Sequence, residues 1–362
     1  MDTPEGFAKW IKKLKVKATG VRPVSLPGRG LGMIATRDLK KGEAIMKIPI
    51  SIIHSLHSVP ADIKAKLGPD MSTHGLVAAQ LTFFGPESIG WVKTVPSYAE
   101  FEEVVPLLWP DELQQLLPRE ARDITLDQKS RFGTDWARFH AAYPDSRYED
   151  YMVGWTLVNT RAFYYETPDL LMLPWHDRVA LLPAADLFNH TSSGCTVMFS
   201  PECYTVTTDK KYKAGTEVCT SYGDLSNDSL MAEYGFVLDD NEWDKLCLDD
   251  VILPRLNETQ RLGLKANGYL GEYMLQTTGT KRSANVWIAL RVLVAKRPQW
   301  NKYVNGEEDS EGTLQKAIGA SIDDRSRAAA GVASPAMGAD RDSNQASSRT
   351  SESFRSGMMT AL

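Results

Sequence analysis

The sequence predicts an α+β protein in which small sheets are interrupted by a block of helices. Two stretches, about 21–55 and 180–237, consist of short alternating segments broken by Gly and Pro, which is the pattern of short strands joined by turns. Between them, from about residue 73 to 161, apolar residues recur at helical spacing. A second helical pattern follows residue 253, so the predicted order is strands, helices, strands, helices.

The first twenty residues, 1–20, predict an amphipathic helix. Apolar residues at Phe7, Trp10 and Leu14 fall on one helical face. The polar side carries a local excess of lysines, namely Lys9, Lys12, Lys13, Lys15 and Lys17. We interpret these lysines as the solvent-facing side of a helix that packs on the rest of the protein.

The remaining organisation follows from shifts in composition. We expect one domain over 21–237, with its helical insert at about 70–175, and a helical domain over 238–320. The last segment, 321–362, is rich in Ser and Ala and has almost no large apolar residue. Such a segment buries too little surface to offset the entropy of ordering, so we expect it to be disordered.

The charge balance and hydropathy narrow the class of partner. The 362 residues carry 41 Lys and Arg against 46 Asp and Glu, a net charge of −5 with His neutral. Proteins that bind nucleic acid through its phosphates usually show a basic surplus, so no nucleic-acid partner is expected.

No apolar run approaches the ~18 residues of a membrane span, and the start lacks the basic and apolar regions of a secretory signal. We therefore expect no membrane partner and a cytoplasmic monomer, with the nucleus and the plastid left open.

Cysteine and histidine spacing predicts no metal site. The four cysteines are Cys195, Cys203, Cys219 and Cys247, and no two of them form a Cys-x-x-Cys pair. The sequence therefore gives no support for a zinc ribbon or a redox-active dithiol. The six histidines are scattered and form no cluster.

A glycine-rich stretch, Gly28-Arg29-Gly30-Leu31-Gly32, precedes a predicted strand at Met33-Ile34-Ala35. A dinucleotide fingerprint or a phosphate loop needs a helix directly after its glycines, and none follows here. This order excludes an oxidoreductase with a nucleotide-binding fold. Taken alone, the glycines predict only a turn.

Two later stretches combine residues that carry chemistry: Ala184-Ala185-Asp186-Leu187-Phe188-Asn189-His190, and Ser221-Tyr222-Gly223-Asp224 with Glu233-Tyr234-Gly235-Phe236 downstream. Each alone is explained by a turn or by core packing. Together with the glycine-rich stretch and the helical insert, they resemble the SET-domain protein methyltransferases. The order and spacing, including Val158-Asn159-Thr160-Arg161-Ala162-Phe163, are similar to the zinc-free branch typified by Rubisco large-subunit methyltransferase, which also includes actin-histidine methyltransferases.

The resemblance implies a fold and a cofactor. The fold would be a SET domain of small sheets with a pseudoknot, interrupted by the insert and followed by an all-α substrate-binding domain. That last domain stops near Ile318 and is short for the family, so either the docking surface is reduced or the sequence diverges there. The implied cofactor is S-adenosylmethionine.

The resemblance also implies the residues that bind this cofactor. The backbone at Gly30 and Leu31 would approach it closely, which a side chain would prevent. Arg161 would hold its carboxylate, because a guanidinium forms two parallel bonds to such a group. The remaining cofactor-binding residues implied are Asp186, Asn189, His190 and Tyr234.

Tyr222 is the implied catalytic residue. Methyl transfer to an amine needs a neutral lysine nitrogen, although the reference pKa of lysine is about 10.4. Desolvation and the cofactor's sulfonium charge both favour loss of the proton, so Tyr222 would orient the reacting groups rather than act as a base. The substrate-binding residues implied are Thr160, whose backbone carbonyl would bind the amine, and Phe163, which would wall the lysine channel.

These inferences predict a protein-lysine N-methyltransferase acting on a non-histone protein, since the chain lacks the cysteine-rich modules of many histone-directed members. The actin-histidine branch carries an Asn shortly after the matching Arg, whereas Ala162-Phe163-Tyr164 follows Arg161 here, which favours lysine. Two alternatives stay open: a histidine methyltransferase of the same fold, and an inactive SET-like scaffold that binds a protein. Retention of Tyr222 together with Asn189 argues against the scaffold.

Overall fold

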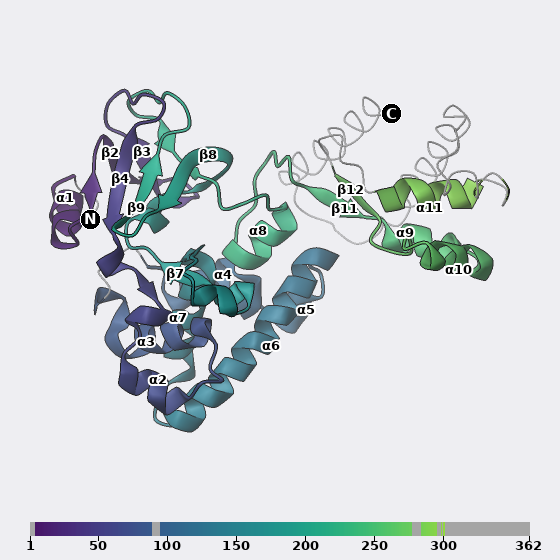
Figure 1. The fold of residues 1–362 in the computed structure, drawn as a ribbon, viewed down its shortest axis with the longest axis horizontal. Helices are drawn as coiled ribbons and strands as arrows, with labels where there is room; N and C mark the ends of the chain where they lie inside the picture. Colours follow the sequence, from purple (N-terminus) through teal and green to yellow (C-terminus); the bar gives the residue numbers. More distant parts are fainter. Residues whose placement is uncertain (1–3, 89–94, 277–283, 295–297, 299, 301–362) are drawn as a thin grey trace, which may run out of the picture. The chain divides into compact units, whose positions relative to one another are not determined.

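The structure is a computed structural model that describes residues 4–88, 95–276, 284–294, 298 and 300 (Figure 1). It contains two compact units, Met1–Asp239 and Asp240–Leu362. The sheets and the long helices of the first unit share one continuous hydrophobic core. In Figure 1 the long helices of this unit lie together below its larger sheets.

The first unit has three small sheets among its described residues. The four-stranded sheet has the order β1 (Lys17–Ala18), β4 (Ala44–Pro49), β9 (Cys203–Thr207) and β8 (His190–Phe199). The two three-stranded sheets have the orders β10 (Glu217–Val218), β3 (Gly30–Ala35), β2 (Val21–Leu26), and β5 (His54–Ser55), β7 (Val179–Leu181), β6 (Ala162–Tyr164). Every pairing between these strands is antiparallel.

Strands β2 and β3 form a hairpin, and the glycine-rich stretch begins in its turn and continues into the start of β3. Gly28 and Gly30 have φ values of +69° and +67°, which glycine adopts without the steric cost that a Cβ would bring. Strand β4 follows β3 in sequence but belongs to the other sheet, so the chain crosses from one sheet to the next at residues 36–43. The hairpin therefore stands beside β10, which leads toward Tyr222.

Residues 219–220 pair with the chain at two points around the start of β8, where the sequence analysis expects a pseudoknot. The Thr220 N–H donates to the Asn189 carbonyl at 3.0 Å, and the Cys195 N–H donates to the Cys219 carbonyl at 2.8 Å. A Cβ at Gly194 would lie 2.7 Å from that Cys219 oxygen, so only glycine allows this close approach. The Asn-His turn and the Tyr222 segment are thereby fixed to one another.

The helical insert is built around buried aromatic rings. Its helices are α2 (Ala61–Leu67), α3 (Thr73–Ser88), α4 (Tyr98–Val104), α5 (Asp111–Gln114), α6 (Arg119–Ala142) and α7 (Tyr148–Arg161). Phe139 of α6 stacks on Tyr151 of α7 with ring centroids 4.2 Å apart. A Cβ at Gly154 of α7 would lie 2.8 Å from the Ala78 carbonyl, so this glycine lets α3 and α7 pack closely. The insert thus holds the end of α7, where Thr160 and Arg161 lie, in a fixed position.

Two further helices belong to the first unit. Helix α1 (Pro4–Lys13) buries Phe7 and Trp10 in the core. Helix α8 (Asn227–Tyr234) corrects the sequence interpretation, which treated residues up to about 237 as strand-like. The Ser226 hydroxyl caps its first turn by accepting the Ser229 N–H, and Gly235 ends it with φ +78°. Eight residues are too few for helical periodicity to stand out among neighbours rich in Tyr and Gly.

The described part of the second unit is mainly helical, with α9 (Asp249–Ile252), α10 (Glu258–Ala266) and α11 (Ala284–Val294). The prediction of an all-α domain missed two short strands, β11 (Lys245–Cys247) and β12 (Met274–Gln276), which pair antiparallel. Strands of three residues carry too little alternation to be read from sequence. The tail predicted to be disordered, 321–362, lies outside the described residues.

In the ranges that the structure describes, no helix is both long and apolar enough to cross a membrane. Over the same ranges, no three His, Cys, Asp or Glu side chains lie where they could share a metal ion.

Candidate active site

The residues predicted to form the site come from four parts of the first unit. They are the start of β3, the end of α7 with the adjoining β6, the turn that leads into β8, and the segment that runs from β10 through Tyr222 into α8. Hydrogen bonds, an ion pair and ring contacts join most of them.

Tyr222 is attached at both ends to the Asn-His turn. Its hydroxyl donates to the Phe188 carbonyl at 2.8 Å, and its backbone N–H donates to His190 Nδ1 at 3.0 Å. Burial raises the pKa of the Tyr222 phenol far above its ordinary value, so the hydroxyl remains protonated at neutral pH. The phenol is therefore a fixed donor whose oxygen lone pairs stay available, and it is no base.

Three aromatic rings gather around this phenol. The Tyr222 centroid lies 5.1 Å from that of His190 and 5.1 Å from that of Tyr234. Phe236 completes the group at 6.2 Å from Tyr234 and 6.4 Å from Tyr222. The negative faces of aromatic rings attract cations, so this enclosure suits a positively charged ligand or product.

His190 is buried and neutral. Its Nδ1 accepts the Tyr222 N–H, which places the ring proton on Nε2. Burial also lowers the pKa of His190. Nε2 is buried and has no hydrogen-bond partner among the described residues, so a polar donor is left over at the site.

Arg161 and Asp186 form an ion pair at 2.8 Å. The Asp186 side chain is 1% exposed and the Arg161 side chain 21% exposed, so the pair sits at the edge of the interior. Among described residues only Nη1 of Arg161 makes a hydrogen bond, which leaves Nε and Nη2 for a second carboxylate. The turn that carries Asp186 includes Ala184 at φ +77°, a strained conformation for a residue with a Cβ.

Glu217 is a site residue that the sequence analysis missed. Its Oε1 accepts from Asn189 Nδ2 at 2.8 Å, and its Oε2 accepts from Arg29 Nη1 at 2.7 Å. Because the Asn189 amide nitrogen donates to this carboxylate, the Asn189 amide oxygen is turned away from Glu217. The amide oxygen can therefore accept a hydrogen bond from a ligand. The contact joins positions 28 residues apart in sequence, and no motif marks it.

The glycine-rich stretch leaves room beside this amide. A Cβ at Gly32 would lie 2.7 Å from Asn189 Nδ2 and 2.8 Å from Glu217 Oε1. A Cβ at Gly30 would meet nothing within 4 Å, so open space adjoins the exposed start of β3. Leu31, between them, is half-buried.

The ends of α7 and α8 are joined through Glu233. The Asn159 and Gln128 side-chain amides both donate to its Oε2, at 3.1 and 2.8 Å. Burial raises the pKa of Glu233. The hydroxyl of Thr160 donates back to the Thr156 carbonyl at 2.9 Å, which engages its proton within α7.

Comparison with known proteins decides the family. The SET domain matches residues 30–223, more than half of the chain. The chain belongs to the SET-domain family. This confirms the resemblance drawn from the motifs.

Relatives of this SET domain include enzymes with different acceptors. The chain is 24% identical over 296 residues to the ribosomal lysine N-methyltransferase set11 of Schizosaccharomyces pombe, covering 80% of this chain and 74% of that protein. It is 26% identical over 345 residues to SET domain-containing protein 4 of Mus musculus, covering 86% and 77%. It is also 26% identical over 266 residues to the human actin-histidine N-methyltransferase, covering 66% and 43%.

Solved structures agree on the fold of this SET protein. The structure of Rubisco LSMT bound to AdoMet matches with a TM-score of 0.56 at 17% identity, over 82% of this chain and 72% of that chain. The SET domain of LSMT bound to lysine and AdoHcy matches with a TM-score of 0.55 at 16% identity, over 83% and 74%. The predicted fold class is therefore confirmed.

Phe163, a predicted substrate-binding residue, contacts a different ring from those around Tyr222. Its ring packs edge-on against Tyr204 of β9 with centroids 5.6 Å apart, and Tyr204 in turn contacts Phe199. Among the described ring contacts none joins Phe163 to the group around Tyr222. Its role toward a substrate stays a prediction.

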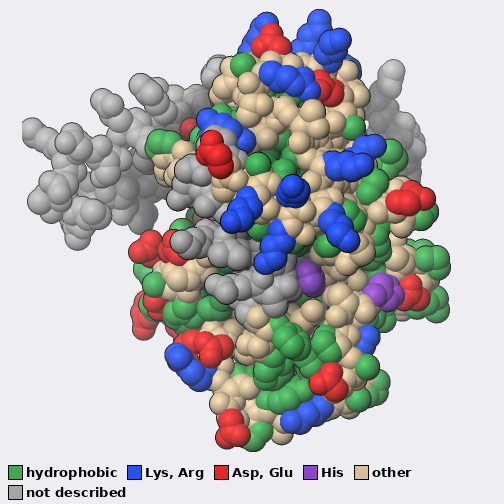
Figure 2. All heavy atoms as spheres, turned by 90° about the vertical axis from the view of Figure 1, so that its left-hand side faces the viewer, with side chains coloured by type: hydrophobic (Ala, Val, Ile, Leu, Met, Phe, Trp, Pro, Cys, Tyr) green, Lys and Arg blue, Asp and Glu red, His purple; other side chains and the backbone are tan. Residues whose placement is uncertain are grey.

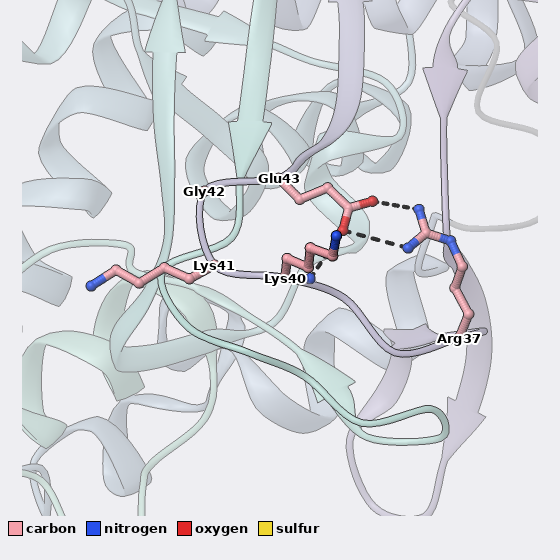
Figure 3. A pocket seen from close by; sticks show the side chains of 5 residues that line it. All are labelled: Arg37, Lys40, Lys41, Gly42 and Glu43. Carbon is pink, nitrogen blue, oxygen red and sulfur yellow. Dashed lines mark hydrogen bonds and ion pairs between the residues drawn. The ribbon is translucent and has the colours of Figure 1, made fainter.

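A surface hollow on the loop between β3 and β4 is separate from these residues (Figure 3). It is lined by Arg37, Lys40, Lys41, Gly42 and Glu43. Arg37 faces Glu43 and forms an ion pair with it, while Lys41 points away. None of the predicted site residues of the SET domain lines it.

Proposed function

We propose that this SET domain is an S-adenosylmethionine-dependent protein-lysine N-methyltransferase acting on a non-histone protein. The observation that carries the proposal is the Tyr222 hydroxyl, held on the Phe188 carbonyl inside a group of aromatic rings. The similarity to a relative named as a ribosomal lysine N-methyltransferase supports a lysine acceptor. We assign catalysis to the unit 1–239 and protein-substrate docking to the unit that follows. A cytoplasmic location and a monomeric state remain predictions.

The residues present fit the proposed cofactor. Bound S-adenosylmethionine supplies an electrophilic methyl group on a sulfonium centre. Nε and Nη2 of Arg161 would bind its carboxylate, and the Asn189 amide oxygen would accept from its ammonium group. The open space beside Gly30 would receive it without a steric clash, next to the backbone of Leu31. The buried Nε2 of His190, with no partner among described residues, gives a further donor.

The chain's own residues would accelerate the reaction by positioning. Tyr222 stays protonated and His190 Nδ1 is occupied, so neither removes a proton from the acceptor. The lysine amine would instead lose its proton to water as the enclosure desolvates it. The Tyr222 oxygen and the carbonyl of Thr160 would then align the amine for in-line attack.

The residues after Arg161 help to distinguish a lysine acceptor from a histidine acceptor. A histidine acceptor has two ring nitrogens, and a side-chain amide that binds one of them would direct the other at the methyl group. Ala162, Phe163 and Tyr164 provide no amide at that point. We therefore favour lysine, and histidine is the alternative because actin-histidine N-methyltransferases are among the relatives.

A labelling experiment tests this function. The purified chain is incubated with methyl-tritiated S-adenosylmethionine and an undermethylated lysate of its own source, beside Tyr222→Phe and Asn189→Ala variants. We expect a labelled protein band that both variants lose. Absence of a band together with absence of cofactor binding by calorimetry would replace the proposal with the inactive scaffold.

A further inference from the structure

The charge of this chain is unevenly distributed. Residues 1–50 hold eleven Lys and Arg against four Asp and Glu, whereas the rest of the chain holds thirty against forty-two. The chain therefore has a basic N-terminal portion, although its net charge is −5. The expectation that no nucleic acid binds rested on the net charge alone.

The fold collects the lysines of this portion on one side of the first unit. Helix α1 buries Phe7 and Trp10, so its lysines lie on the opposite, solvent-facing side. Figure 2 looks onto the side on which α1 lies in Figure 1, and Lys and Arg side chains there outnumber Asp and Glu. We call the following exposed residues the lysine face: Lys9, Lys12, Lys13, Lys15, Lys17 and Lys47.

The register of the sheet brings two of these lysines directly together. Lys17 of β1 is the antiparallel partner of Lys47 of β4, and both are exposed, so their side chains share the outer surface of the sheet. Like charges directly opposite one another on neighbouring strands destabilise a sheet. An anion bound at this surface would remove that repulsion.

Nothing in the described residues neutralises the lysine face. None of its six members forms an ion pair with a described residue. Of the described carboxylates in the same portion, Asp38 is bound to Lys213, Glu43 is bound to Arg37, and Glu5 is exposed in the first turn of α1. The lysines are therefore free to bind a partner with several negative charges.

The elements that carry the lysine face offer no apolar anchor. The large apolar side chains that stand exposed among described residues include none from α1, β1 or β4. A helix that lies on a membrane needs its apolar side free to enter the lipid, and that side of α1 is occupied by the core. Protein interfaces depend on buried aromatic or aliphatic anchors, which are also missing here.

Rows of lysines without such anchors fit a regular line of phosphates. We propose that the lysine face binds the phosphate backbone of a nucleic acid, independently of base sequence. Binding itself does not depend on methyl transfer; if the proposed function holds, the face would bring the enzyme to a protein acceptor carried on a nucleic-acid particle.

Fluorescence anisotropy tests the proposal with a labelled single-stranded RNA and a labelled DNA duplex of about 25 units each, in increasing KCl. If six phosphates are contacted, log K falls against log salt with a slope of about −4 for the single strand and about −5 for the duplex. We expect Lys12→Gln/Lys13→Gln, and separately Lys17→Gln/Lys47→Gln, each to weaken binding about tenfold or more and to make the slope shallower by about 1 to 2.

Two controls separate the lysine face from general charge. Arg255→Gln/Lys265→Gln removes the same charge from exposed positions outside the face and should leave binding unchanged. Lys12→Arg/Lys13→Arg keeps the charge and should retain the salt slope. The proposal is overturned if the wild-type chain binds neither nucleic acid, or if Arg255→Gln/Lys265→Gln weakens binding as much as the two Gln pairs on the lysine face. It is also overturned if polyglutamate or phosphatidylserine vesicles bind in preference. Since no methyl transfer is measured, failure here leaves the proposed enzyme untouched.

Discussion

The Tyr222 hydroxyl donates to the Phe188 carbonyl at 2.8 Å, one residue before Asn189. A single hydrogen bond thus couples the phenol proposed for catalysis to the turn proposed for cofactor binding. The backbone bond from Tyr222 to His190 Nδ1 adds a second connection on the other side of Asn189. A change at Tyr222 should therefore alter alignment more than it alters affinity.

Replacing Tyr222 by Phe removes the donor and leaves the ring in place. We expect kcat to fall on the order of a hundredfold, because positioned donors and acceptors at a reacting centre contribute about that much. Cofactor affinity measured by calorimetry should change little, since the residues proposed to bind the cofactor stay intact. Tyr204→Phe, which removes the same atom from a buried ring outside the site, is the matched control and should keep full activity.

Replacing Asp186 by Asn removes the buried negative charge that pairs with Arg161. We expect a loss of about 2 to 3 kcal/mol in the free energy of unfolding, less than for a fully buried pair because Arg161 is partly exposed. Urea unfolding provides the measurement. Asp38→Asn breaks an ion pair of 2.7 Å to Lys213 at the surface, and equal destabilisation by both variants would contradict the assignment.

Replacing Gly32 by Ala should displace the Asn189–Glu217 contact. The new Cβ would lie within 2.8 Å of both side chains and 2.5 Å from Leu26 Cδ1. Calorimetry should show cofactor affinity reduced at least about tenfold, as expected when a positioned polar group is misaligned. Gly133→Ala, in α6 with open space around it, should bind cofactor normally and gain up to ~1 kcal/mol in stability. Normal cofactor binding by Gly32→Ala would argue against a role for Asn189.

The free energy of unfolding should decrease as the pH drops, because the buried His74 resists protonation in the folded chain. Burial lowers the pKa of His74 to about 3, well below the ordinary value of about 6.5 that it has when unfolded. Between these two values the unfolded chain binds a proton that the folded chain does not, so stability is complete above pH 6.5 and declines as the pH drops. His54, whose pKa burial lowers to about 4, acts with the same sign.

Urea unfolding at several pH values measures this effect. His74→Gln should reduce the decline between about pH 6 and 4 by roughly 1 kcal/mol per pH unit. Burial raises the pKa of Asp135, which opposes the decline at the acid end. His140→Gln, at an exposed position of the same insert, should leave the profile as it is in the wild type, and an identical profile for His74→Gln would refute the attribution.

The sequence predicted the fold class because its motifs stand at points where the backbone has little freedom. Gly-x-Gly at a hairpin and Asn-His at the turn before β8 are local patterns, and apolar residues recur at helical spacing along the insert. Short elements escaped prediction. The helix at Asn227–Tyr234 and the strands β11 and β12 have too few residues to display a period.

The sequence named candidate site residues, but it did not show which atoms contact one another. Asn189, Tyr222 and Arg161 were all named from motifs, whereas their partners were not. The Phe188 carbonyl is a backbone atom with no side-chain signal, and Glu217 meets Arg29 across 188 residues of sequence. Phe163 was also named from its place in the motif, and its contact with the Tyr204 ring was not visible in the sequence.

The most direct test of the central claim is mass spectrometry of the band labelled by the wild-type chain and absent with Tyr222→Phe. The account predicts a methyl group on a lysine side chain of a non-histone protein. A methyl group on histidine would contradict the lysine assignment while keeping the enzyme, and a label that Tyr222→Phe leaves in place would contradict the site itself.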